Sequence, residues 1–68
     1  MTLVNKFRAI VIAVAKQAVA EKADTKPLGD GLMLVKEDSA EGQSRLGKSG
    51  IVAERIEVSG ISFLVCNA

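Results

Sequence analysis

The spacing of apolar residues changes once along this chain, and a single proline marks the change. Up to Asp24, apolar side chains recur every three or four positions, a spacing that predicts one buried face of a helix. The residues of this stripe are Phe7, Ile10, Val11, Val14, Ala18 and Val19. Pro27 has no backbone N–H group and cannot continue the helix. Beyond it, apolar and polar residues alternate over 55–59, and Ile61, Phe63 and Val65 recur at every second position after Gly60. The sequence therefore predicts an α+β fold, with an N-terminal amphipathic helix followed by a small antiparallel β unit.

These patterns divide the chain into a helical segment, residues 1–24, and a β domain, residues 25–68. Residues 31–36 form a short apolar run that we read as a strand. Residues 37–49 are polar and contain one large aliphatic residue, so burial cannot offset the entropy lost on ordering them. We therefore expect a long mobile loop there. A helix over 49–56 competes with a strand, and a phase change at Gly60 predicts a bulge or a tight turn.

Length and composition restrict the classes of function. A chain of 68 residues forms one small domain, and such domains bury only about 60% of their unfolded surface. We therefore expect self-association into a homo-oligomer. There is no His for a zinc site, Cys66 is the single cysteine, and a formal charge of +1 with two aromatic residues argues against nucleic-acid binding. With no paired acids and no activated nucleophile, we expect neither an enzyme nor a cofactor or metal.

The first twenty residues contain no acid and carry Lys6, Arg8 and Lys16. Such a basic, amphipathic start is typical of an organellar targeting segment as well as of a surface helix. The uninterrupted apolar run from Ala9 to Ala15 is too short to span a bilayer. We therefore expect a surface helix in a cytoplasmic protein. The alternative location is an organellar matrix or stroma, if residues 1–20 are a targeting segment.

A series of motifs follows the helical segment. Lys26-Pro27-Leu28-Gly29-Asp30 precedes an apolar strand, an acidic stretch with Ala40-Glu41 comes next, and Gly50-Ile51-Val52 ends the series. This order resembles the amino-terminal half of a GroES-type co-chaperonin, and residues 60–65 resemble the strand that follows in that family. The resemblance implies a partial β-barrel whose mobile loop docks onto a chaperonin ring and so assists protein folding. Gly50, Ile51 and Val52 would be the residues that bind the ring.

The polar stretch also supports a second hypothesis. Gly42, Gly47, Lys48 and Ser49 match the phosphate-binding pattern G-x-x-x-x-G-K-[ST]. In that motif, backbone N–H groups surround a phosphate, the lysine reaches its oxygens, and the hydroxyl holds Mg²⁺. The motif requires a buried strand before its first glycine and a helix that begins at the lysine. A nucleotide-binding site is therefore an alternative to the docking loop.

A third hypothesis concerns the end of the chain. Gly29-Asp30-Gly31-Leu32 together with residues 60–66 is similar to DsrE-like sulfur-relay proteins, which end a parallel strand with a cysteine that carries a persulfide. The resemblance implies that Cys66 is a sulfur carrier. A lone cysteine at the end of an apolar strand is more often a small core residue. The docking module is the preferred hypothesis, and the other two remain alternatives.

Overall fold

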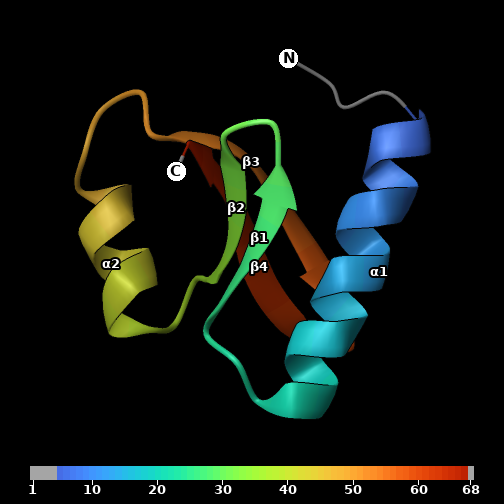
Figure 1. The fold of residues 1–68 in the computed structure, drawn as a ribbon. Helices are drawn as coiled ribbons and strands as arrows, with labels where there is room; N and C mark the ends of the chain where they lie inside the picture. Colours follow the sequence, from blue (N-terminus) through green and yellow to red (C-terminus); the bar gives the residue numbers. More distant parts are fainter. Residues whose placement is uncertain (1–4, 68) are drawn as a thin grey trace.

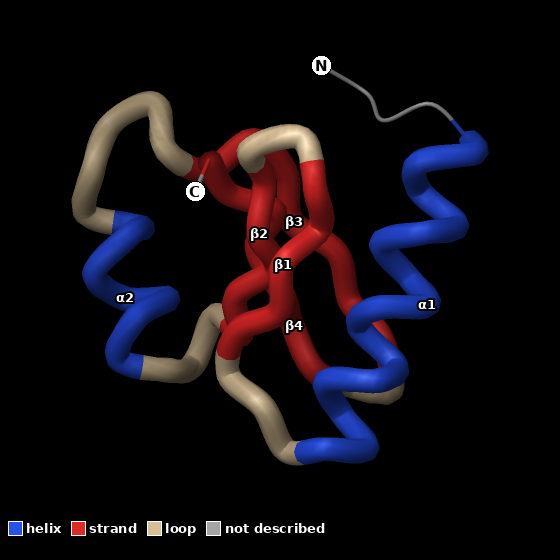
Figure 2. Tube along the Cα trace, in the orientation of Figure 1, coloured by secondary structure: helices blue, strands red, loops and turns tan. Residues whose placement is uncertain are grey.

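The computed structural model describes residues 5–67 as two helices and four strands (Figure 1). In chain order the elements are α1 (Asn5–Glu21), β1 (Thr25–Gly29), β2 (Leu32–Lys36), α2 (Ala40–Leu46), β3 (Val52–Val58) and β4 (Ile61–Asn67). The strands form one antiparallel sheet in the order β1-β2-β4-β3. Figures 1 and 2 show α1 and α2 on opposite sides of this sheet. The predicted α+β fold is therefore confirmed.

The helix α1 packs on the sheet with every residue of the predicted stripe except Ile10. Val11, Ala15 and Ala18 follow the i, i+4, i+7 spacing and are fully or almost fully buried against the sheet. Ile10 was expected on this face but is 47% exposed, because it lies one position, about 100° of helical rotation, away from Val11. Residues 1–4 of the predicted segment lie outside the described residues. Within residues 5–67, neither helix has both the length and the apolar content needed to cross a membrane.

The helix α1 ends with a residue that has left-handed backbone dihedrals although it is not a glycine. Lys22 has φ +55°, and its N–H donates to the Val19 carbonyl at 3.3 Å. The Ala23 N–H donates to the Ala18 carbonyl at 3.0 Å, so the two bonds together form a Schellman motif. The motif satisfies the last helical carbonyls and redirects the chain into β1.

The central strand β4 is buried on both faces, which gives the sheet two apolar layers. Phe63 and Val65 join the core beneath α1, whereas Leu64 and Cys66 point to the opposite face. Together with Val35 they form the second core, which Met33, Ile51 and Val52 cover in part. A strand buried on both faces reads as a continuous apolar run, as residues 63–66 do.

Two tight hairpins define the register of the sheet. Asp30-Gly31 joins β1 to β2, and Ser59-Gly60 joins β3 to β4. All four residues have positive φ, between 54° and 76°, which is the signature of type I′ turns. The phase change at Gly60 is therefore a tight turn, and residues 52–58 form a strand rather than the competing helix.

The structure corrects the prediction of a mobile loop over residues 37–49, because α2 occupies its centre. The sequence argument considered only apolar burial, which is indeed small in this helix. The helix is stabilised instead by its cap, by an ion pair on its surface and by a close backbone contact. Each of these depends on a specific residue rather than on hydrophobic content.

Candidate functional site

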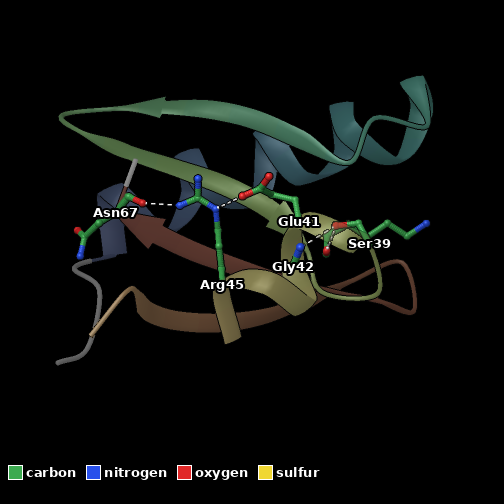
Figure 3. Close-up of polar contacts among 6 residues, drawn as sticks. Ser39, Glu41, Gly42, Arg45 and Asn67 are labelled. Carbon is green, nitrogen blue, oxygen red and sulfur yellow. Dashed lines mark hydrogen bonds and ion pairs between the residues drawn. The ribbon is translucent and has the colours of Figure 1, made fainter. Parts of the chain in front are cut away.

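Ser39 and Gly42 hold the start of α2 against the end of β2. The Ser39 Oγ accepts a hydrogen bond from the Gly42 N–H at 3.0 Å, so Ser39 is the N-cap of the helix (Figure 3). The same hydroxyl donates to the Lys36 carbonyl at 2.7 Å. Gly42 is buried directly above the Lys36–Glu37 backbone, where a Cβ atom would come within 2.3 Å of the Lys36 oxygen. Only glycine allows so close an approach of the helix to the strand.

Arg45 joins the other end of α2 to the end of β4. Its Nη1 donates to the Asn67 carbonyl at 2.7 Å, and its Nε lies 2.7 Å from the Glu41 Oε2, one helical turn earlier (Figure 3). The guanidinium therefore bridges two elements that are more than twenty residues apart in the chain. Its positive charge lies beside the last residues of the central strand.

The Gly50–Ile51–Val52 turn, expected at the end of a mobile loop, is anchored to the same strand end. The Asn67 backbone N–H donates to the Ile51 carbonyl at 3.0 Å, and the Asn67 Nδ2 donates to the Gly50 carbonyl at 3.2 Å. Gly50 has φ +77°, which a glycine adopts without strain. The side chains of Ile51 and Val52 are half-buried, because each packs on one side against the second core.

Cys66 lies beneath this turn. It pairs with Val52 on β3 and with Met33 on β2, and it is fully buried. Burial raises the pKa of the Cys66 thiol, the positive charge of Arg45 acts to lower it, and Glu41 acts to raise it. The structure thus brings together the predicted docking residues and the predicted sulfur carrier, which the sequence treated as separate sites.

The four residues of the phosphate-binding pattern take a different arrangement from the one that the motif requires. Gly42 lies inside α2, and Gly47 caps its end, so the helix precedes the turn instead of following it. The Lys48 N–H already donates to the Arg45 carbonyl at 3.1 Å. Ser49 and Gly50 continue in a turn that leads into β3. The nucleotide-binding hypothesis stays a prediction, and this arrangement gives it no support.

Sequence reasoning missed Arg45 and Asn67, which hold the site together. The spacing of Glu41 and Arg45, an acid four residues before a base, is a local signal of a helical ion pair and could have indicated α2. No local signal identifies Asn67 as the residue that anchors the turn. Its partners lie sixteen and seventeen residues away and become neighbours only when β3 pairs with β4.

A second polar cluster, formed by Glu37, Arg55 and Ser62, lies on the same face of the sheet as the second core. The Glu37 carboxylate accepts from the Ser62 Oγ at 2.7 Å and from the Arg55 Nη2 at 3.1 Å. The Arg55 Nε also lies 3.0 Å from the Glu37 Oε1.

Within residues 5–67, no three His, Cys, Asp or Glu side chains lie close enough to hold a metal ion. Comparison with known proteins finds no matching family model, curated protein or solved structure.

Proposed function

We propose that this protein is a small protein-binding module that docks through the Gly50–Ile51–Val52 turn into an apolar groove of a partner protein. The resemblance to GroES-type co-chaperonins indicates a chaperonin ring as the partner, and assisted protein folding as the role. The observation that carries the proposal is that Ile51 and Val52 remain only partly buried, Ile51 in a turn held by Asn67 and Val52 at the start of β3. Docking would remove their remaining apolar surface from water, which is favourable.

The binding affinity for a partner has a different origin in an anchored turn than in a mobile loop. A mobile loop loses part of its binding free energy to ordering, whereas a turn already held in one conformation loses less. The apolar contact of one copy is nevertheless small. Several copies bound to the subunits of one ring would gain affinity through avidity, without any further contact. The proposal therefore fits a multivalent partner better than a monomeric one.

Titration calorimetry of the protein with a purified chaperonin ring tests the proposal. The variant Ile51→Ser should weaken binding at least roughly tenfold, because a polar side chain replaces the anchor. The matched control is Leu46→Ser, which makes the same change at a residue of α2 that is 40% exposed and outside the turn. It should bind the ring as the unmodified chain does.

Ile51 also packs on the second core, so its substitution has to be separated from unfolding. Circular dichroism and a urea titration show whether Ile51→Ser remains folded, and Ile51→Val, which keeps an aliphatic anchor, should retain binding. No binding by the unmodified protein would refute the proposal. An equal loss of binding in Leu46→Ser would also refute it, because the contact would then be unspecific.

A second candidate function is sulfur transfer by Cys66, as the DsrE-like resemblance implies. The specific observation in its favour is that the two resembling segments meet, because Leu32, which ends the first segment and begins β2, pairs with Asn67, the residue after Cys66 on β4. The charge of Arg45 also acts on the thiol. Two observations oppose it. All described strands are antiparallel, whereas the resemblance implies a parallel one, and burial raises the pKa of the thiol.

In this reaction the Cys66 thiolate would attack the outer sulfur of a donor persulfide. The S–S bond of the donor breaks, a new S–S bond forms on Cys66, and the donor leaves as a thiolate that takes up the proton. Incubation with a small-molecule persulfide, followed by intact mass spectrometry, should show one added sulfur atom that is absent in Cys66→Ser. Loading should be slower in Arg45→Met than in Arg45→Lys, which keeps the charge. A folded protein that accepts no sulfur would exclude this function.

A further inference from the structure

The two edges of the sheet differ in their ability to pair with another strand. The edge strand β1 has five residues, includes Pro27, which has no N–H to donate, and is interrupted by a bulge between Pro27 and Gly29. Such features are typical of edges that are protected from association. The edge strand β3 has seven residues and no proline. Among the described residues, no strand pairs with its outer edge.

The exposed side chains of β3 form a pattern that is complementary to itself. Arg55 and Glu57 are two residues apart, so they project from the same face of the sheet, and both are exposed. Arg55 contacts Glu37 on its inner side, and Glu57 takes part in none of the ion pairs among residues 5–67. Along the outer edge of β3, this face of the sheet therefore carries one positive side chain, Arg55, and one negative side chain, Glu57.

Symmetry limits the ways in which two copies of β3 can pair. If a two-fold axis perpendicular to the sheet relates them, one residue lies opposite its own copy, and the neighbours on either side lie opposite each other. With Ile56 at the axis, Arg55 of each copy faces Glu57 of the other copy, which gives two attractive contacts. With Arg55 or Glu57 at the axis, like charges face each other, which is destabilising.

We propose that the protein forms a homodimer in which β3 pairs antiparallel with β3 of a second copy, with Ile56 at the two-fold axis. The two sheets then become one continuous sheet. The outward N–H and C=O groups of β3 gain partners in this dimer. Association of this kind would also add to the small core that a 68-residue chain can bury. With Ile56 at the axis, the two copies of β3 overlap only over residues 54–58. The docking residues Gly50, Ile51 and Val52 lie outside this overlap, so the dimer can be tested apart from the proposed docking.

Charge substitutions on β3 test both the interface and its register. The variants Arg55→Glu and Glu57→Arg each place like charges opposite one another, so each should weaken dimerisation by roughly tenfold or more. An equimolar mixture of the two variants restores opposite charges at both contacts and should form a heterodimer. Arg8→Glu and Asp24→Arg are the matched controls, because they make the same changes of charge at exposed positions outside β3, and Asp24 precedes the opposite edge strand β1.

Sedimentation velocity over a range of concentrations, at low and at moderate salt, gives the dimerisation constant of each variant. We expect the unmodified chain and both controls to form dimers, the single variants to be mostly monomeric, and their mixture to sediment as a dimer. A monomeric unmodified chain would overturn the proposal. So would a dimer that survives both single substitutions, or a mixture that does not associate. Circular dichroism of each variant separates a lost interface from a lost fold.

Discussion

Gly42 provides the most direct test of how α2 is held. In an isolated helix, replacing glycine by alanine is stabilising by about 1 kcal/mol. In this structure the added Cβ would lie 2.3 Å from the Lys36 oxygen and 2.6 Å from the Glu37 oxygen, both of which belong to the backbone. Side-chain rearrangement cannot relieve these contacts. To reach the 3.0 Å below which real contacts essentially never occur, α2 or the strand end has to move by about 0.7 Å.

The expected cost of Gly42→Ala follows from these contacts. Overpacking a tight site typically costs about 1–3 kcal/mol. A shift of α2 also weakens the Ser39–Gly42 hydrogen bond and the bond from Arg45 to Asn67, each worth roughly 1 kcal/mol. After the gain in helix propensity is subtracted, we expect the free energy of unfolding to fall by about 2 kcal/mol. In a domain of this size that corresponds to a decrease in Tm of roughly 10 °C.

Gly47→Ala is the matched control within the same helix. Gly47 caps α2 in a right-handed conformation with φ −76°, and an added Cβ there meets no atom closer than 3.6 Å. This variant should be neutral or stabilising by about 0.5–1 kcal/mol. Urea titrations followed by circular dichroism give the two values, and hydrogen exchange of the α2 amides reports local loosening. If Gly42→Ala proved as stable as Gly47→Ala, α2 would not pack on the strand end, and the mobile loop predicted over residues 37–49 would be the better description.

Two further predictions concern the cap and the thiol. Ser39→Ala removes the hydroxyl that accepts from the Gly42 N–H, so urea titration should show a loss of about 1 kcal/mol. Ser39→Thr, which keeps a hydroxyl that can both accept from Gly42 and donate to the Lys36 carbonyl, should recover most of it, and an unchanged midpoint in Ser39→Ala would contradict the cap. Because burial raises the pKa of Cys66 in the folded chain, the folded state binds the thiol proton more tightly than the unfolded state. The unfolding free energy should therefore fall as the pH rises from the unfolded pKa through the folded pKa, and this fall should be absent in Cys66→Ala; equal pH dependence in both proteins would show that the thiol is not responsible.

The sequence alone was sufficient for features that depend on local spacing and turn chemistry. The period of the apolar residues predicted α1. The apolar residues at every second position predicted β4 and also β3, although a helix over 49–56 remained as an alternative to β3. The dipeptides Asp30-Gly31 and Ser59-Gly60 occupy turns whose positive φ values suit these residue types. In each case the residues that determine the structure lie within a few positions of one another. Their preferences therefore act before any distant contact forms.

The tertiary structure decided how distant segments meet. The helix α2 is too short to be stable on its own, so its existence depends on the close contact at Gly42 and on the bond from Arg45 to Asn67. The meeting of the Gly50–Ile51 turn with Cys66 requires β4 to lie between β2 and β3. No local pattern encodes that order of strands, because it is set by the packing of both faces of the sheet as a whole. The same strand order, β1-β2-β4-β3, places β3 at one edge of the sheet, where its seven residues have no neighbouring strand on the outer side among the described residues.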